Sequence, residues 1–351
     1  MMFLALKRES LERVVLVKIL KIEHMSKVFN PNTINENKVF DDFSLEVDKG
    51  DFVTIIGSNG AGKSTLLNII AGSITEDSGK ILINNEEVSN KPEYKRAKSI
   101  GRVFQNPSVG VSPNMTILEN MSLADNKGKR FGLTSGINKK KIDEYKEMLK
   151  RVDLGLEDKL FNKVQLLSGG QRQALTLLMA TLRAEPTHKQ IIKDYVTFSM
   201  GDKEKAREEV TSAYNNAFIE YKGKIKEISK QKGLGFKEKR NLKKQYYKEF
   251  DEKVRKYDLT KQILLLDEQT AALDPKTARK VLELTEKIVR ENQMTTLMIT
   301  HNMKDAITYG DRLIMFYEGH IIHDIKGAEK KKLTVEQLLK MFDEAERNSV
   351  K

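Results

Sequence analysis

The sequence predicts an α/β fold, with a parallel sheet, an antiparallel β edge and an inserted helical hairpin. Continuous apolar runs at residues 52–56, 263–266 and 296–299 have the pattern of buried strands, and helical patterns at 65–71 and 277–292 alternate with them. Alternating apolar residues over 39–47 favour antiparallel strands with one buried face. Together these patterns predict a parallel core with an antiparallel edge.

Composition sets limits on what the chain can be. It has 351 residues, a net charge of +12 and a hydrophobic fraction of 39%, which is enough for a buried core. This length suggests two domains, or one large domain with an insertion. Cysteine is absent, so disulfides, thiolate metal sites and cysteine nucleophiles are excluded. The apolar runs are strand-length, and charges interrupt residues 1–20, so we expect neither a membrane span nor a signal peptide but a soluble, intracellular protein.

Residues 187–260 differ sharply from the rest of the chain. They hold 19 Lys plus Arg against 12 Asp plus Glu, a net charge of +7 that leaves +5 for the other 277 residues. Apolar residues recur at helical steps on both sides of Gly233-Leu-Gly235, which predicts an α-helical hairpin with charged outer faces. A solvated hairpin without a partner is the simpler interpretation. An anionic membrane, RNA or another subunit would be a functional partner.

These patterns divide the chain into five segments. We predict an N-terminal extension at 1–20, a first part of the α/β domain at 21–186, the helical insertion at 187–260, a second part at 261–328 and a C-terminal helix at 329–351. A polar helical pattern over about 107–170 predicts a helical subdomain within the first part.

Two charged or histidine-bearing stretches near the C-terminus have simple interpretations. The run from Glu329 to Lys332 is expected to be solvated. His320 and His323 lie at a three-residue step in a strand-like run without a third ligand nearby, so we do not expect them to bind a metal.

One glycine-rich segment carries the chemistry of phosphate binding. Residues 57–64 fit the pattern G-x-x-x-x-G-K-[ST] and lie directly between a buried strand and a helix. Glycines let backbone N–H groups wrap around phosphates, and the helix N-terminus adds partial positive charge. Lys63 would contact the terminal phosphates, and the Ser64 hydroxyl would ligate Mg²⁺. The expected nucleotide-binding residues here are Gly57, Ser58, Asn59, Gly60, Ala61, Gly62, Lys63, Ser64 and Thr65.

A second motif would complete the same site. The apolar run from Ile263 ends in the carboxylate pair Asp267 and Glu268. Asp267 would hold Mg²⁺, directly or through a water, and Glu268 would act as general base or orient the attacking water. An apolar run that ends in two carboxylates is common in proteins. Here it indicates part of a nucleotide-binding site because a phosphate-binding loop lies upstream.

With these motifs the chain resembles an ABC-type ATPase, the nucleotide-binding subunit of ABC transporters, over about 21–186 and 261–325. Leu167-Ser-Gly-Gly-Gln-Arg-Gln173 matches the signature of that family and opens a helix. The resemblance implies a P-loop NTPase core of ABC ATPase type, ATP and Mg²⁺ as cofactors, and a dimer. In such a dimer the signature of one subunit closes over the ATP of the other. Ser168, Gly169, Gly170 and Gln171 would then face the γ-phosphate.

Four further positions match roles known in the family. The resemblance implies that Gln105 contacts Mg²⁺ and couples to the permease, and that Asp274 lies in the loop linking the two sites. It also implies that His301 contacts the γ-phosphate and that Phe29 stacks on adenine. Taken singly, each has a simpler structural interpretation, such as a core aromatic or a loop glutamine. The implied catalytic residues are Lys63, Glu268 and His301, and the implied metal ligands are Ser64, Gln105 and Asp267.

The chain departs from the family pattern in two ways. Gln269 stands where most of the family has proline, but both catalytic carboxylates remain, so we expect activity to survive. Ser168 lies 99 positions before Asp267, and removing the 74 residues 187–260 leaves 25, an ordinary spacing for the family. The insertion is therefore expected to be discrete.

The resemblance implies a peripheral protein on the cytoplasmic face of the membrane. It would work as a homodimer, or paired with a second cassette subunit, on a transmembrane permease. The segments 171–182, 271–277 and 300–303 resemble a bacterial importer subgroup linked to amino-acid uptake, which would add an extracytoplasmic substrate-binding protein.

Two other functions stay open. An ABC-type ATPase acting on nucleic acid or ribosomes through the basic hairpin would bind with an affinity that falls steeply with salt, although we do not expect nucleic acid as the partner. A regulator without turnover is disfavoured because Glu268 and His301 are both present.

Overall fold

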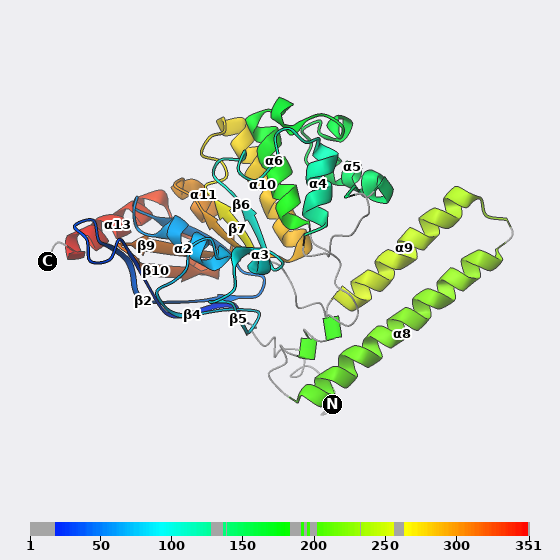
Figure 1. The fold of residues 1–351 in the computed structure, drawn as a ribbon, viewed down its shortest axis with the longest axis horizontal. Coiled ribbons are helices and arrows are strands. Elements are labelled where there is room, and N and C mark those ends of the chain that lie inside the picture. The colour runs from blue at the N-terminus through cyan, green and yellow to red at the C-terminus, as the bar shows by residue number, and fades with distance from the viewer. Residues whose placement is uncertain are drawn as a thin grey trace. The chain divides into compact units, whose positions relative to one another are not determined.

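A computed structural model describes residues 18–127, 136–137, 139–182, 191–192, 195–196, 202–231, 233–255 and 263–349. The chain divides into two compact units (Figure 1). We call Met1–Ala184 with Gln262–Lys351 the main unit, and Glu185–Lys261 the hairpin unit.

A mostly parallel sheet forms the centre of the main unit. Its six strands among the described residues have the order β10-β9-β3-β8-β7-β6. All neighbours are parallel except β10, which pairs antiparallel with β9 at one edge. The apolar runs of β7 and β8 are buried, as expected for strands covered on both faces. The strands are β3 (Phe52–Gly57), β6 (Ile100–Val103), β7 (Ile263–Asp267), β8 (Thr295–Ile299), β9 (Arg312–Tyr317) and β10 (His320–Lys326).

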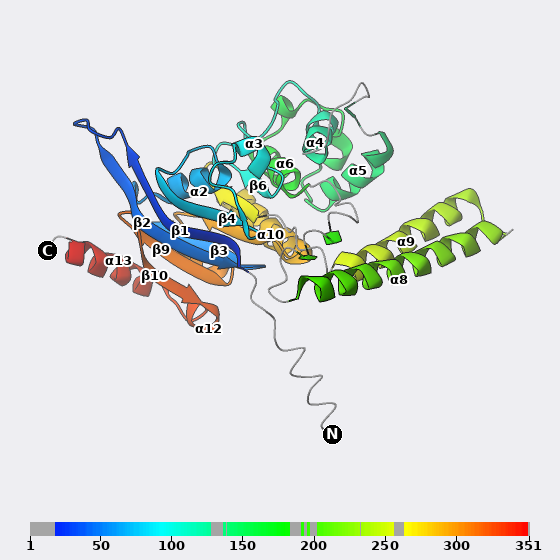
Figure 2. The ribbon, with the colours of Figure 1, turned by 60° about the horizontal axis from the view of Figure 1, so that its bottom comes forward.

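A second, antiparallel sheet supplies the predicted β edge. Its order is β2-β1-β4-β5, and Figure 2 shows the long hairpin that β1 and β2 form. Its strands are β1 (Lys18–Phe29), β2 (Asn37–Asp48), β4 (Ser78–Ile83) and β5 (Glu86–Glu87). The alternation in β2 buries Phe43, Leu45 and Val47 on one face. β1 is described from Lys18 onward, and residues 1–17 of the predicted N-terminal extension lie outside the described residues.

Helices cover the parallel sheet and build the helical subdomain. α4, α5 and α6 gather on one side of the main unit in Figure 1, and α4 and α5 fall within the region 107–170 that was predicted to be helical. A capping box between Thr116 and Glu119 fixes the start of α4. The helices are α2 (Lys63–Ala71), α3 (Glu93–Arg96), α4 (Ile117–Asp125), α5 (Ile142–Lys150), α6 (Gly169–Thr181), α10 (Pro275–Asn292), α11 (Met303–Thr308), α12 (Gly327–Lys330) and α13 (Val335–Ser349), with short 3-10 helices at Lys139–Lys141, Glu157–Lys159 and Val164–Leu166.

Three apolar clusters hold the main unit together. One lies between the two sheets and α2, and a second joins α4, α5, α6 and α10 to the parallel sheet. The third places Leu338 of α13 with Ala306 of α11 and Ile56 of β3. The C-terminal helix therefore packs on the strand that leads into the phosphate-binding loop.

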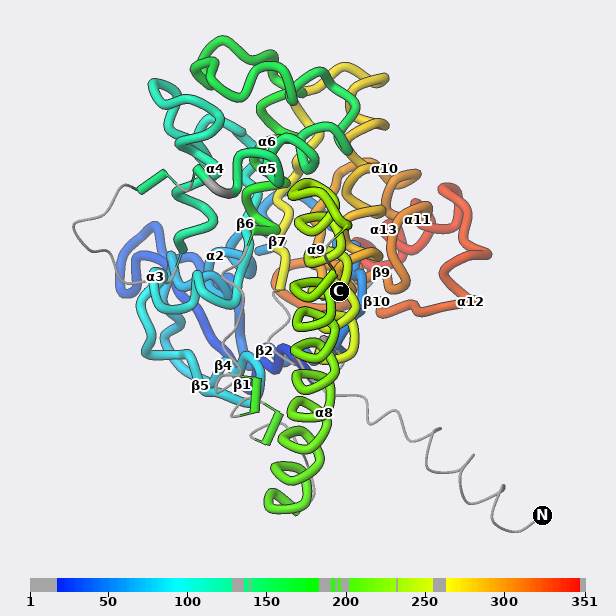
Figure 3. The backbone as a smooth tube through the Cα atoms, turned by 90° about the vertical axis from the view of Figure 1, so that its right-hand side faces the viewer, coloured from blue at the N-terminus to red at the C-terminus, as the bar shows by residue number. Residues whose placement is uncertain are grey.

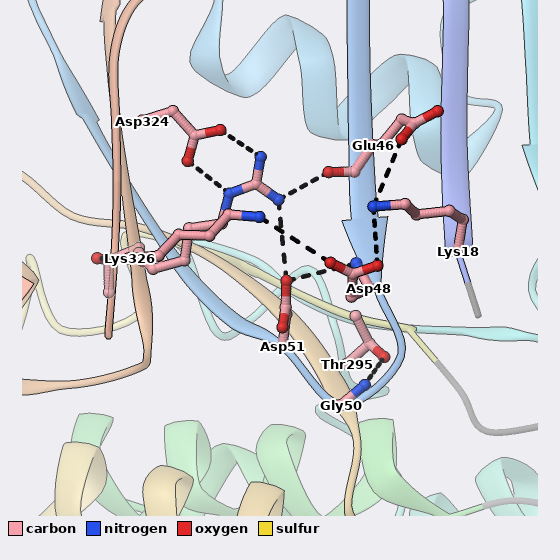
Figure 4. Close-up of polar contacts among 10 residues, drawn as sticks. Lys18, Glu46, Asp48, Gly50, Asp51, Thr295, Asp324 and Lys326 are labelled. Atoms are coloured by element: carbon pink, nitrogen blue, oxygen red, sulfur yellow. Dashed lines mark hydrogen bonds and ion pairs between the residues drawn. The ribbon is translucent and has the colours of Figure 1, made fainter. Parts of the chain in front are cut away.

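A network of ion pairs ties the two sheets together at one end (Figure 4). Arg312, which is almost fully buried, donates to both carboxylate oxygens of Asp324 at 2.7 and 2.6 Å and to the carbonyl of Glu46 at 2.7 Å. Asp48 pairs with Lys18 at 2.9 Å. Bidentate geometry and backbone contacts satisfy the buried guanidinium, so the network fixes β9 and β10 against β2.

The charged run near the C-terminus differs from its prediction at one residue. Lys330 is not solvated but buried, because α12 turns its ammonium inward to donate to Thr54 Oγ1 and the Tyr309 carbonyl. Burial lowers the pKa of Lys330 to about 8. The expectation of a fully solvated stretch was therefore wrong.

The hairpin unit consists mainly of two long helices. α8 (Lys203–Lys230) and α9 (Phe236–Arg255) lie side by side in Figures 1 and 3. Asp202 begins α8 by accepting from the N–H of Glu204 at 2.9 Å. An aromatic cluster joins the helices, with Phe250 of α9 centred 5.5 Å from the ring of Tyr214 and 5.4 Å from that of Tyr221. Among all described residues, no helix combines the length and apolar character needed to cross a bilayer.

Candidate nucleotide-binding site

The phosphate-binding loop joins the end of β3 to the start of α2. Gly60 and Gly62 have φ values of +81° and +94°, which L side chains rarely adopt. A Cβ on Gly62 would also lie 2.9 Å from side-chain atoms of Val39 and Phe40. No side chain caps α2, and its first turn has no acidic residue. The N-terminus of α2 is therefore suited to an anion supplied from outside.

Lys63 is held inside this loop. Its ammonium donates to the carbonyls of Gly57 at 2.9 Å and Ser58 at 2.8 Å. Burial lowers the pKa of Lys63, while the nearby carboxylates of Glu268 and Asp267 act in the opposite direction. The cation thus lies within the curve of the loop, at the level where phosphates would bind.

Ser64 and Asp267 meet across the interface of α2 and β7. The Ser64 hydroxyl donates to Asp267 Oδ1 at 3.1 Å. Burial is the main cause that raises the pKa of Asp267, so a cation at this point would stabilise its charged form. Hydroxyl and carboxylate oxygens are ligands that Mg²⁺ prefers, usually together with waters and phosphate oxygens. These residues therefore fit a Mg²⁺ ion that accompanies a nucleotide.

Glu268 receives contacts from the ends of two neighbouring strands. His301 Nε2 lies 2.5 Å from Glu268 Oε1, and the Gln105 amide donates to Glu268 Oε2 at 3.1 Å. The residues follow β8, β7 and β6, whose carboxyl ends meet at one edge of the sheet. Glu268 itself has a φ of +45°, an unusual backbone conformation for a glutamate. The sheet thus brings two predicted site residues, Gln105 and His301, to the carboxylate of a third, Glu268.

One cavity of about 280 Å³ brings most of the predicted site together. Residues 59–65 line it with Glu268, His301 and Phe29. The Lys27 ammonium lies 5.5 Å from the centre of the Phe29 ring. An aromatic ring, a phosphate-binding loop and a carboxylate therefore face the same space, which fits a base, a phosphate chain and an attacking water.

The signature residues lie elsewhere in the main unit. Ser168 begins α6 through a capping box, in which its hydroxyl accepts from Gln171 N at 3.3 Å. A Cβ on Gly169 would lie 3.6 Å from Leu273, and one on Gly170 would meet Thr277 at 2.2 Å. Asp274 begins α10 by accepting from Thr277 N at 3.1 Å. The signature thus packs beside Asp274, and none of these residues lines the cavity at the phosphate-binding loop.

Several residues near the site were not predicted from sequence. Asn37 and Val39 of β2 line the cavity, and only their alternation in a strand could have indicated which of them face inward. Gln269, the departure from the family pattern, is buried and donates to Thr285 Oγ1 of α10 at 3.0 Å. This hydrogen bond satisfies Nε2 of Gln269, whereas its Oε1 is buried without a hydrogen-bond partner among the described residues.

Comparison with known proteins identifies the chain. A family model described as ABC transporter matches residues 40–188. A tyrosine transport ATP-binding protein of Clostridioides difficile is 40% identical over 328 residues, which cover 93% of this chain and all of the relative. The chain belongs to the ABC transporter family. It is an ATP-binding subunit that hydrolyses ATP to drive transport.

More distant relatives of this ABC ATPase are consistent with that assignment. A carnitine transport ATP-binding protein, OpuCA of Listeria monocytogenes, is 27% identical over 304 residues, covering 87% of this chain and 54% of the relative. A dimeric post-hydrolysis state of the ATP-binding cassette MJ0796, bound to ADP and Pi, has a TM-score of 0.56 and 23% identity, covering 88% of this chain and 98% of that one. This likeness confirms the predicted fold class. The nucleic-acid alternative draws no support from these relatives.

Proposed function

We propose that this ABC ATPase binds ATP with Mg²⁺ in the cavity at the phosphate-binding loop. Residues 57–65 would hold the phosphates, Phe29 would stack on adenine, and Ser64, Gln105 and Asp267 would hold the metal. When bound, Mg²⁺ would neutralise charge on the β- and γ-phosphates. The convergence of Gln105 and His301 on Glu268, beside Lys63, is the observation that carries this proposal.

Within this site each catalytic side chain has a distinct task. Glu268 would orient the attacking water and take its proton, since its carboxylate borders the cavity and is only 13% exposed. His301 would hold the position of that carboxylate and contact the γ-phosphate, and Lys63 would stabilise charge that develops on the phosphoryl oxygens.

We also propose that the working form is a dimer on a membrane permease. In one chain the signature at Ser168 does not line the ATP cavity, so a second subunit would have to supply it. Ser168, Gly169, Gly170 and Gln171 would then face the γ-phosphate across the dimer, and Asp274 would link the two sites. A homodimer, or a pair with another cassette, would lie peripherally at the cytoplasmic face of the membrane.

The cargo is proposed to be an amino acid that is imported. Support comes from the relative named for tyrosine transport, at 40% identity. A substrate-binding protein outside the membrane would deliver the cargo to the permease. The decisive measurement is uptake of labelled tyrosine, with other amino acids as competitors, in cells with and without this chain. Uptake of tyrosine that is independent of the chain would reject this cargo and leave the ATPase assignment intact.

The catalytic proposal is tested by ATP turnover and oligomeric state of Glu268→Gln beside the wild type, with Mg²⁺ present. We expect turnover to fall on the order of 100-fold or more, because the carboxylate that accepts the proton is lost. The variant should accumulate as an ATP-bound dimer on size exclusion.

Glu87→Gln is the matched control, since Glu87 is an exposed carboxylate of β5 away from the cavity. Its turnover should equal that of the wild type. Equal turnover in Glu268→Gln, or the absence of any ATP-dependent dimer, would refute the proposed role of Glu268 or the dimeric site.

A further inference from the structure

The positive charge of the hairpin unit is concentrated at one end. Residues 222–244, which include the turn between α8 and α9, carry nine lysines and one arginine against two glutamates, a net charge of +8. We call these residues the outer half. Residues 202–221 and 245–255, the base half, carry a net charge of −2. The positive charge of the insertion is therefore distributed unevenly, which differs from the even distribution expected if it served only to keep two helices in solution.

The ion pairs of the hairpin follow the same division. Glu220 and Glu249 of the base half pair with Lys224 at 3.2 and 2.7 Å, and Glu220 also pairs with Lys253. The acidic residues thus neutralise cations along the base and at its border. Towards the turn, the sequence offers only Glu227 and Glu238 against the remaining cations.

The turn between α8 and α9, which with Phe236 we call the apex, also presents apolar surface. Phe236, the first residue of α9, is 88% exposed. Leu234 precedes it in the turn, and Lys230 and Lys237 flank the pair in sequence. Elsewhere in the hairpin, aromatic rings of the two helices contact one another, and even the most exposed of them, Tyr247 at 41%, is far less exposed than Phe236. An exposed aromatic ring with lysines close to it in sequence is a combination that binds the boundary between lipid headgroups and acyl chains.

We propose that the outer half of the hairpin docks on the headgroups of an anionic lipid membrane. Its lysines would lie among lipid phosphates, and Phe236 would enter the headgroup boundary. The cassette would thereby gain an attachment to the bilayer beside its permease. This inference rests on the chain being a transporter subunit, and does not depend on the identity of the cargo.

The observations favour a membrane over a nucleic acid. Nine of the ten cations are lysines, which interact with phosphate as point charges, whereas specific recognition of nucleic acids relies on the planar fork of arginine. An exposed aromatic side chain at the end of a helical hairpin can insert into the headgroup region of a lipid bilayer. The relatives of the chain are named for transport.

The test is co-sedimentation of the full chain with vesicles of phosphatidylcholine alone or mixed equally with phosphatidylglycerol. The triple variant Lys230→Gln, Lys237→Gln and Lys244→Gln removes three exposed cations of the outer half. Its affinity for anionic vesicles should fall on the order of 100-fold. Binding of the wild type should weaken as salt increases and be negligible on neutral vesicles.

The matched control removes three exposed cations of the base half, Lys203→Gln, Lys205→Gln and Arg207→Gln. Of these three residues, Arg207 lies nearest to the outer half, 15 residues and about 22 Å before Lys222 along α8, at 1.5 Å per residue. This distance exceeds the screening length of about 8 Å, so affinity should change less than about threefold. Circular dichroism checks that both triple variants keep the helical content of the wild type.

A second pair of variants tests the apex without altering charge. Phe236→Ala should weaken binding to anionic vesicles about tenfold, because the apolar area that the phenyl ring would bury in the membrane is lost. Ile219→Ala removes another exposed apolar side chain, on the base half, and should leave binding unchanged.

Four results would overturn the proposal. These are equal binding to neutral and anionic vesicles, equal losses in the two triple variants, full binding by Phe236→Ala, and no vesicle binding by the wild type. A single-stranded RNA is the counter-probe. If RNA binding required the outer half while vesicle binding did not, the surface would be a nucleic-acid interface instead.

Discussion

The two units of the chain use charged side chains in opposite ways. In the main unit, Ser64 and Asp267 meet across 203 residues of sequence, and Glu268 receives contacts from two other strands. In the hairpin unit, ion pairs such as Lys224 with Glu249 join partly exposed side chains of two helices. In the main unit each charged side chain of the site has one fixed position and one set of partners. In the hairpin unit the feature that matters for our proposal is the summed charge of many side chains along the helices. Single substitutions should discriminate between these two modes.

The sharpest form of this comparison replaces one lysine in each unit. Lys63→Ala should lower ATP turnover on the order of 1,000-fold, since it removes a preorganised cation from the phosphate-binding loop. Lys224→Ala removes a paired, partly exposed lysine of the hairpin and should leave turnover unchanged. Steady-state phosphate release measures both. A comparable loss of ATP turnover in the two variants would contradict the view that only the main unit takes part in catalysis.

The buried Lys330 predicts a pH dependence of stability specific to the main unit. Its pKa is lowered from 10.5 to about 8, so between these values the unfolded chain keeps a proton that the folded chain has released. Stability should therefore rise with pH across this window and carry the full penalty below pH 8. Relative to Lys330→Met, the free energy of unfolding of the wild type should increase by about 3 kcal/mol from neutral pH to pH 10.5.

Urea denaturation across that pH range measures this difference, and Lys331→Met provides the control. Lys331 is the next residue and is exposed, so its variant should follow the wild type at every pH. A constant difference between wild type and Lys330→Met would mean that the lysine is solvated after all.

Features of the fold that depend on residues close together in sequence could be predicted, whereas features that depend on contacts between distant elements could not. The phosphate-binding loop, the buried strands and the hairpin helices follow from local spacing, because backbone periodicity and turn chemistry dictate them. The burial of Lys330 does not, since α12 is a four-residue helix without periodicity and its partners, Thr54 and Tyr309, come from distant elements.

The site shows the same limit. Motifs predicted that Glu268 and His301 follow strand ends, but their contact at 2.5 Å depends on β7 and β8 being neighbours, which only the sheet order decides. The lining of the cavity by Asn37 and Val39 depends likewise on how the antiparallel edge approaches the loop. The position of Gly170 beside Thr277 rather than at the cavity also requires the packing of α6 on α10.

Within the hairpin unit, the largest effect of a single substitution should come from the aromatic cluster. Phe250→Ala removes the ring that contacts Tyr214, Phe218, Tyr221 and Tyr247, and should lower the free energy of unfolding of the hairpin by about 2 kcal/mol. Amide hydrogen exchange in α8 and α9 should accelerate accordingly. Phe236→Ala, at the exposed apex, should leave exchange unchanged, and ATP turnover should be that of the wild type in both. Slower turnover in Phe250→Ala would couple the hairpin to catalysis.

The smallest expected effect follows from removing the hairpin altogether. Replacing residues 187–260 with a flexible linker of about 15 residues should leave ATP turnover within about twofold of the wild type, because the length of a surface connection costs little free energy. Binding to anionic vesicles should be lost in the same protein. Glu268→Gln in the shortened chain serves as the control, since it should still abolish turnover. A folded, shortened chain that loses turnover more than about tenfold would contradict the division of labour, because the hairpin would then belong to the catalytic machinery rather than to a surface attached to it.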